Sequence, residues 1–311
     1  MPTLYWLQGA GCGGDTFSLL SSDAPNLYDL CNTLNIDLLW HPSLSNTTVQ
    51  QQAALHEQIR SGAIALDFFM LEGAALLGPN GTGMFDARDG QPKKDLIRDL
   101  AQSAQHVIAV GTCAAYGGVN ARERVQSIGL QYDKNERGGL LGEDFTSKSG
   151  MPVINLAGCP CHHDIITGTI IALAHGQQLE LDGFQRPLEW FNTSVHQGCT
   201  RNEYHEYRVE ESCFGESGCL FFHLGCNGPI VPGPCNKLLW NQQSSKPRSG
   251  VPCFGCTDPR FPGQEPFFQT PNIEGIPLRL PMGINRAHYM VYKTMAAAAA
   301  PDRLKKRFQK V

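Results

Sequence analysis

The cysteines are the residues whose type and spacing point most directly to chemistry in this sequence. Three of the twelve, Cys12, Cys113 and Cys159, each come shortly after a brief apolar run and a glycine-containing turn. Thiolates are preferred ligands for soft metal ions and for iron–sulfur clusters. A single such cysteine is more often an ordinary buried residue. Three at equivalent places favour one shared cofactor site.

The second half of the chain carries a denser series of candidate ligands, since nine of the twelve cysteines lie between Cys159 and Cys256. The spaced candidates in this series are His196, Cys199, Cys219, Cys226, Cys235, Cys253 and Cys256. A structural zinc site would use two closely spaced pairs from the series and would leave three thiols without a role. Seven ligands match one four-ligand and one three-ligand iron–sulfur cluster better than a single zinc ion.

The elements that must position these residues can be read from the hydrophobic pattern. Short apolar runs alternate with helical patterns along the first half, which is typical of parallel βα units. Strands are expected over residues 4–7, 36–40, 66–71, 107–110 and 153–156, and helices over residues 23–34, 49–60, 94–105 and 164–175. The carboxyl ends of such strands meet at one edge of a sheet, where the first three cysteines would converge.

The later part of the chain has little periodicity and many turns, aromatic residues and cysteines. The sequence therefore predicts an α/β fold with a doubly wound parallel sheet over residues 1–180, followed by a loop-rich, cysteine-rich domain over residues 181–311. We expect the chemistry to lie in the loops of both domains, because the fraction of glycine and proline is high.

Charge and composition exclude several classes of function. With 25 Lys and Arg against 29 Asp and Glu, the formal net charge is -4, so a nucleic-acid partner is not expected. Apolar runs of 18 residues are absent from the sequence, which excludes a membrane-spanning helix. The first eight residues show neither a basic region nor an apolar stretch typical of export signals, so we expect a cytoplasmic protein.

Taken together, these motifs resemble the small, iron–sulfur subunit of NiFe hydrogenases over nearly the whole chain. The resemblance is carried by residues 6–14 (WLQGAGCGG), 39–43 (LWHPS), 72–73 (EG), 111–118 (GTCAAYGG), 158–160 (GCP) and the later Cys/His series. It implies a flavodoxin-like first domain and a second domain that holds two clusters. It also implies that the NiFe centre belongs to a separate large subunit, so no catalytic residue is expected in this chain.

The resemblance also assigns the candidate ligands to three clusters. It implies a proximal cluster held by Cys12, Cys113 and Cys159, a distal 4Fe4S cluster held by His196, Cys199, Cys219 and Cys226, and a medial 3Fe4S cluster held by Cys235, Cys253 and Cys256. The medial assignment rests on Lys246, which stands where some hydrogen-sensing members carry a fourth cysteine. An imidazole in place of a thiolate makes a cluster less negative and raises its potential.

The proximal cluster departs from the family pattern at one position. Most members carry a second cluster cysteine three residues after the position of Cys12, and this sequence has Asp15 there. Asp15 is interpreted either as a carboxylate ligand or as a helix N-cap, since a helical stretch follows it. Cys161 is a further candidate for the fourth ligand, ranked below Asp15. The proximal cluster is accordingly expected to be 4Fe4S or, with an open corner, 3Fe4S.

These observations predict an electron-transfer subunit that relays electrons from hydrogen oxidation in a large subunit to an acceptor near the distal cluster. One alternative is the small subunit of a hydrogen-sensing regulatory hydrogenase, against which Asp15 and Lys246 argue because sensors are expected to carry thiols there. Another alternative is a zinc-stabilised binding module. The acceptor is not identified by the sequence, and a dimer of heterodimers is left open.

Overall fold

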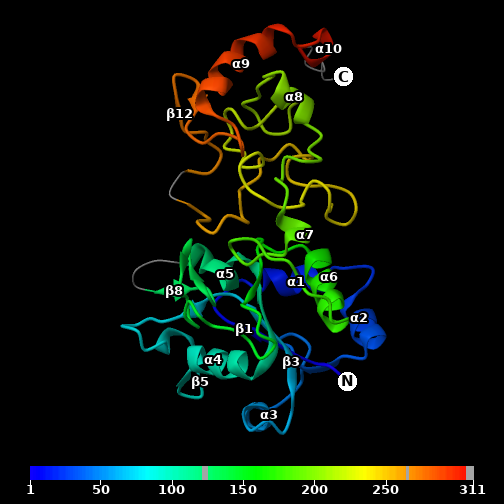
Figure 1. Ribbon diagram of the computed structural model, residues 1–311, viewed down its shortest axis with the longest axis vertical. Coiled ribbons are helices and arrows are strands. Elements are labelled where there is room, and N and C mark those ends of the chain that lie inside the picture. Colours follow the sequence, from blue (N-terminus) through cyan, green and yellow to red (C-terminus); the bar gives the residue numbers. More distant parts are fainter. Residues whose placement is uncertain (121–124, 264–265, 306–311) are drawn as a thin grey trace. The chain divides into compact units, whose positions relative to one another are not determined.

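The computed structural model describes residues 1–120, 125–263 and 266–305. The chain divides into two compact units (Figure 1). The first comprises Met1–Glu189 with Pro259–Phe261, and the second comprises Trp190–Asp258 with Pro262–Val311.

A five-stranded parallel sheet forms the centre of the first unit. Its strands are β1 (Thr3–Gln8), β2 (Asp37–Trp40), β3 (Leu66–Glu72), β7 (Ala104–Val110) and β11 (Ile154–Leu156). Their order across the sheet is β11-β7-β3-β1-β2. This is the flavodoxin-like order, in which the direction of winding reverses between the first and third strands. The predicted doubly wound sheet and all five predicted strands are confirmed.

Helices cover both faces of this sheet. They are α1 (Gly14–Leu20), α2 (Leu27–Leu34), α3 (Val49–Arg60), α4 (Lys93–Ser103), α5 (Gly111–Tyr116) and α6 (His163–Ala174). Both α1 and α2 contact α6, whereas α3 contacts α4 on the other side of the sheet (Figure 1). Strands that are covered on both faces read as continuous apolar runs, and Phe69, Val107 and Ile108 are fully buried.

Local signals explain where two of the helices begin. Thr48 and Gln51 form a capping box at the start of α3, and the predicted bounds of that helix are met. The helix expected from residue 23 begins instead at Leu27, because the Asn26 side chain accepts a hydrogen bond from the Asp29 amide and caps the helix there.

Short elements complete the first unit. They are β4 (Ala75–Leu76), η1 (Met84–Asp86), β5 (Ala87–Arg88), β6 (Gln91–Pro92), η2 (Gly118–Asn120), β8 (Ser127–Ile128), β9 (Tyr132–Asp133) and β10 (Glu136–Arg137). The pairs β4·β8, β5·β6 and β9·β10 are two-stranded and antiparallel.

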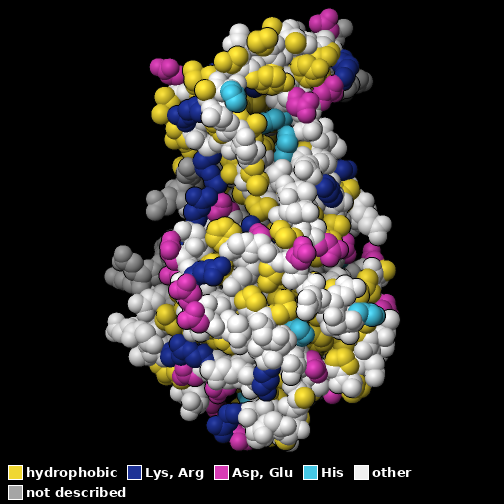
Figure 2. Space-filling model, in the orientation of Figure 1, with side chains coloured by type: hydrophobic (Ala, Val, Ile, Leu, Met, Phe, Trp, Pro, Cys, Tyr) yellow, Lys and Arg dark blue, Asp and Glu magenta, His cyan; other side chains and the backbone are white. Residues whose placement is uncertain are grey.

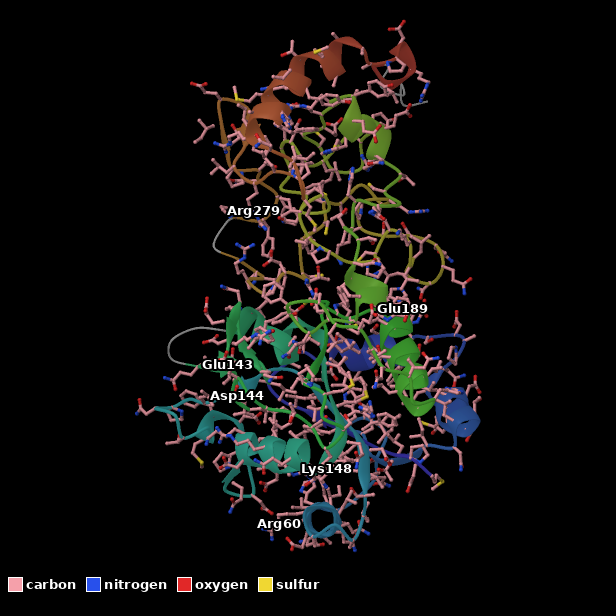
Figure 3. All side chains as sticks on the ribbon, viewed as in Figure 1. Arg60, Glu143, Asp144, Lys148, Glu189 and Arg279 are labelled. Atoms are coloured by element: carbon pink, nitrogen blue, oxygen red, sulfur yellow. The ribbon has the colours of Figure 1, made fainter. Side chains whose placement is uncertain are left out.

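The first unit continues beyond the predicted boundary at residue 180 as far as Glu189, which is labelled in Figure 3. The reason is a set of hydrogen bonds to the segment 183–185. The backbone amide of Asn155 in β11 donates to the backbone carbonyl of Gln185 at 2.8 Å. The Tyr132 hydroxyl donates to the Gly183 carbonyl at 3.0 Å. This segment therefore packs as an extension of the sheet domain.

The second unit has little regular structure, as predicted. Its elements are α7 (Leu188–Phe191), which begins in the first unit, α8 (Asn202–Glu206), β12 (Asn272–Ile273), β13 (Ile276–Pro277), α9 (Arg286–Ala298) and α10 (Asp302–Lys305). Its core is a cluster of aromatic, aliphatic and cysteine side chains that includes Phe221, Phe222 and Tyr289. Cysteines thus stand inside this core.

Apolar side chains gather on the outer surface of α9 (Figure 2). Met290, Val291, Tyr292 and Met295 are exposed there. Among the described residues, the helices are all too short or too polar to cross a bilayer.

Candidate iron–sulfur sites

The loops at the carboxyl end of the sheet are tied to one another by backbone hydrogen bonds. The Gly9 amide donates to the Glu72 carbonyl at 2.7 Å, which joins the loop after β1 to the end of β3. The Thr112 amide donates to the Gly158 carbonyl at 2.8 Å, which joins the loops after β7 and β11. The predicted convergence at one sheet edge is therefore built from direct contacts between these loops.

The predicted proximal ligands lie in these joined loops. A Cβ placed at Gly14 would lie 3.1 Å from Cys12 Sγ and 3.6 Å from Cβ of Pro160, so the Cys12 thiol is beside the loop that carries Cys159. Cys12 and Cys159 are exposed, and Cys113 is half-buried. Burial raises the pKa of the Cys113 thiol, and the neighbouring Asp15 and Cys12 raise it further.

Asp15 lies inside this group of loops, with only 8% of its surface exposed. Its Oδ1 accepts the Cys161 amide hydrogen at 2.6 Å. Gly111 has a φ of 81°, and a Cβ there would collide with the Asp15 carboxylate. Burial raises the pKa of Asp15 to about 7, against the lowering effect of the Cys161 hydrogen bond. The N-cap interpretation is wrong, because the cap position belongs to Gly13 and Asp15 stands in the first turn of α1.

Glu72 anchors the helix that carries Asp15, a role that sequence reasoning missed. Its side chain is buried at 1% exposure. Its Oε1 accepts the amide hydrogens of Asp15 at 3.0 Å and Thr16 at 3.1 Å. Its Oε2 accepts the Trp6 indole hydrogen at 3.1 Å and the Thr16 hydroxyl hydrogen. The local signal for Glu72 in the sequence was its place at the end of an apolar run.

The four predicted distal ligands line one cavity in the second unit. The four are His196, Cys199, Cys219 and Cys226. Arg201 and residues of neighbouring loops also line the cavity. Arg201 donates from its side chain to the carbonyls of Pro247, Glu216 and Gly218, and its amide lies 3.4 Å from Cys199 Sγ. The guanidinium is thus held beside the thiols.

The three predicted medial ligands are also close to one another. Burial raises the pKa of Cys235 to about 12. The neighbouring Cys256 also raises this pKa, whereas Lys246 lowers it. Burial and the nearby thiols raise the pKa of Cys253 well above its usual value. The Cys253 amide lies 3.3 Å from Cys226 Sγ and donates to it, which links the medial and distal groups directly.

The donor chemistry of these groups fits iron–sulfur clusters. Thiols with raised pKa values, buried side by side, lose their protons when they bind iron, and the soft thiolate and imidazole donors suit such clusters. The set of three thiols and one imidazole in the distal cavity also suits zinc. The medial thiols and the proximal group of three thiols and a carboxylate lie outside that cavity, and a single zinc ion would not use them.

The comparisons with known proteins bear on the choice between iron–sulfur clusters and zinc. A family model described as NADH ubiquinone oxidoreductase, 20 Kd subunit, matches residues 12–173. A second, which describes the C-terminal part of NiFe/NiFeSe hydrogenase small subunits, matches residues 191–269. The periplasmic NiFeSe hydrogenase small subunit of Desulfomicrobium baculatum is 30% identical over 284 residues, which cover 85% of this chain and 86% of that protein.

The chain belongs to the small subunits of NiFe hydrogenases. The periplasmic NiFe hydrogenase small subunit 1 of Nitratidesulfovibrio vulgaris is likewise 30% identical, over 86% of this chain and 82% of that one. The solved structure of the actinobacterial-type NiFe hydrogenase from Ralstonia eutropha H16 aligns with a TM-score of 0.76 at 26% identity, covering 98% of this chain and 91% of that chain.

Membership of the family confirms several predictions. NiFe hydrogenases are oxidoreductases whose small subunits carry iron–sulfur clusters and pair with a large subunit that contains the NiFe centre. The catalytic chemistry on hydrogen therefore takes place in the partner chain.

The remaining cysteines and histidines of this small subunit have other surroundings. Cys31 is half-buried in α2, Cys213 is exposed, and Cys161 is fully buried. His162 caps α6, because its Nδ1 accepts the Asp164 amide hydrogen at 3.2 Å. His223 pairs with Glu210 at 2.8 Å. The structural roles predicted for these two histidines are consistent with those contacts.

Proposed function

We propose that this chain relays electrons from hydrogen oxidation in the large subunit to an acceptor, through three iron–sulfur clusters. The observation that carries the proposal is the convergence of His196, Cys199, Cys219 and Cys226 on one cavity. The hydrogen bond from Cys253 to Cys226 adds support, since it joins the second ligand group to the first. Clusters bound at such sites supply one-electron transfer, and the protein supplies their ligands and surroundings.

We propose the following ligands for the three clusters. The distal 4Fe4S cluster takes His196, Cys199, Cys219 and Cys226, the medial 3Fe4S cluster takes Cys235, Cys253 and Cys256, and the proximal cluster takes Cys12, Cys113, Cys159 and Asp15. Support for the medial set comes from the mutual closeness of its three thiols and from Lys246, whose ammonium lies 5.4 Å from the ring centroid of Phe254. A cation stands there rather than a fourth thiol.

Asp15 is proposed as the fourth proximal ligand in preference to Cys161. Its carboxylate lies against Gly111, two residues before Cys113, and it is held there by the Cys161 amide. The Cys161 thiol is fully buried, and Cys161 Sγ lies 3.7 Å from the His162 carbonyl oxygen. A carboxylate is a harder donor than a thiolate, so Asp15→Cys should change the spectrum and potential of the proximal cluster while leaving the other two clusters unchanged.

Hydrogen uptake is proposed over hydrogen sensing. The support is Asp15 and Lys246 at two positions where sensing members are expected to carry thiols. A turnover assay on the purified complex separates the two functions, because a sensor turns over slowly and an uptake enzyme reduces its acceptor at rates typical of enzymes.

The relay is tested by measuring two rates separately: the reaction of hydrogen at the large subunit's centre, and electron transfer from the complex to a dye. Exchange between H₂ and D₂O needs only the large subunit's centre, whereas dye reduction needs the relay as well. We expect His196→Ala in the purified complex to lower dye reduction at least tenfold and to leave isotope exchange within about twofold. Cys213→Ser, at an exposed cysteine with no assigned role, is the matched control and should change neither rate. Equal dye reduction in His196→Ala and the unsubstituted complex would contradict the proposed exit route.

A further inference from the structure

His205 stands beside the distal ligands but is not one of the predicted ligands. It belongs to α8, which begins three residues after Cys199, and its amide donates to the Arg201 carbonyl at 3.1 Å. The Nδ1 atom of His205 lies 3.3 Å from Sγ of Cys219. This is the distance of an N–H···S hydrogen bond, which tolerates a longer separation than an N–H···O bond.

Ligation of Cys219 decides the direction of this hydrogen bond. A thiolate bound to iron carries no hydrogen, so Cys219 Sγ can only accept. The imidazole must then carry its hydrogen on Nδ1 and donate it to the sulfur. Hydrogen bonds to cluster sulfurs are among the interactions that set the reduction potential of a cluster. A donor lowers the electron density on the sulfur and stabilises the reduced cluster, which raises the potential.

The ring of His205 is held in this orientation from several sides. Its centroid lies 4.6 Å from that of His196, 5.3 Å from that of Phe221 and 5.4 Å from that of Phe222, on which it stacks at an interplanar angle of 16°. Phe222 is in turn covered by the guanidinium of Arg208 at 4.1 Å. A donor fixed before reduction needs no reorganisation when the cluster gains an electron.

We propose that His205 is a positioning residue that raises the reduction potential of the distal cluster by donating its Nδ1 hydrogen to Cys219. The inference rests on the proposed distal cluster and adds a residue that acts on it without binding iron. A raised potential at the exit end of the relay favours electrons leaving the medial cluster for the distal one. The contact with His196 places the same ring beside a second proposed ligand, whereas the Nδ1 hydrogen bond goes to Cys219.

The alternative is that His205 serves only as an aromatic packing residue against Phe221 and Phe222. His205→Phe distinguishes the two roles, because it keeps an aromatic ring of similar size and removes the donor. His205→Gln is the conservative variant, since its side-chain amide can again donate to the sulfur. His223→Phe is the matched control, because His223 is exposed and contacts Glu210 rather than a proposed ligand.

The test is a redox titration of the intact hydrogenase, followed by EPR of the distal cluster. We expect His205→Phe to lower the ratio of reduced to oxidised distal cluster about tenfold at a fixed potential, a shift of about 59 mV for a one-electron couple. His205→Gln should recover most of that shift, and His223→Phe should show none.

Three results would overturn the assignment of His205. They are an unchanged potential in His205→Phe, an equal shift in His205→Phe and His205→Gln, and a loss of the distal signal in both variants, which would indicate a structural role. A distal iron–sulfur signal missing from the unsubstituted enzyme would instead contradict the proposed function. The failures of the two proposals are therefore distinguishable.

Discussion

Replacing Glu72 with glutamine should loosen the helix that positions Asp15. The carboxylate accepts hydrogen bonds from four donors, two at each oxygen. Glutamine is isosteric, but one of its two terminal atoms is an NH₂ group that donates and cannot accept. With the NH₂ group at the Oε1 side, both backbone amides lose their acceptor; with it at the Oε2 side, the Thr16 hydroxyl can turn and accept, and only the Trp6 indole loses its acceptor.

The size of the effect follows from this count. A buried donor left without an acceptor costs about 1–3 kcal/mol, and a bond to a charged group lies toward the upper part of that range. The less costly orientation leaves one buried donor without an acceptor, at roughly 2 kcal/mol. Because every 1.4 kcal/mol is a factor of ten, local opening of α1 should become about thirtyfold more frequent.

Hydrogen exchange read by mass spectrometry on the intact complex measures this opening directly. In Glu72→Gln, the amides of Asp15 and Thr16 should exchange about thirtyfold faster than in the unsubstituted protein, while those of α3 stay unchanged. Glu57→Gln is the control, because Glu57 is exposed and pairs with Arg60, which Figure 3 labels at the end of α3. Exchange within threefold of the unsubstituted rate would refute the assigned role of Glu72.

Two further predictions follow from other parts of the first unit. Gly111→Ala places a Cβ against the Asp15 carboxylate at a residue with a φ of 81°, so the EPR spectrum of the proximal cluster should change or be lost, while a normal spectrum would argue against Asp15 as a ligand. Burial lowers the pKa of His41 and of His56 to about 4. The unfolded chain therefore takes up protons first as the pH falls from about 6.5, and stability should decline from there to about pH 4. Thermal unfolding at stepped pH would show this decline, and His41→Gln should make it shallower.

The five strands of the central sheet and the helices α2, α3, α4 and α6 could be predicted from local signals. Continuous apolar runs mark β3 and β7 because both faces of the sheet are covered, and a capping box marks the start of α3. The start of the short helix α1 was placed two residues too late in the N-cap interpretation of Asp15, since the helix has no side-chain cap and a glycine with a φ of 75° at its N-cap. The boundary at residue 180 missed the contacts of segment 183–185, which involve residues about 30 to 70 positions away in the chain.

The candidate ligands could be found from the sequence because their residue types are chemically specific and their positions follow strand ends or fixed spacings. The residues that support them could not. Glu72 acts on Asp15 across 57 positions, and His205 contacts Cys219 across 14 positions. Such contacts depend on how loops meet in space, and the place of Glu72 at the end of an apolar run or of His205 in a polar stretch does not show which residue each contacts.

Cytoplasmic location stays a prediction, which cell fractionation would test. Identification of the acceptor requires isolating the complex with its electron-transfer partner.

Metal analysis with EPR on the anaerobically purified native complex tests the central claim most directly. The account predicts about ten or eleven iron atoms per small subunit, nickel in the co-purifying large subunit and a 3Fe4S signal that disappears on reduction with hydrogen. Zinc with little iron, in a colourless protein, would contradict the cluster assignment and return the cysteines to a structural role.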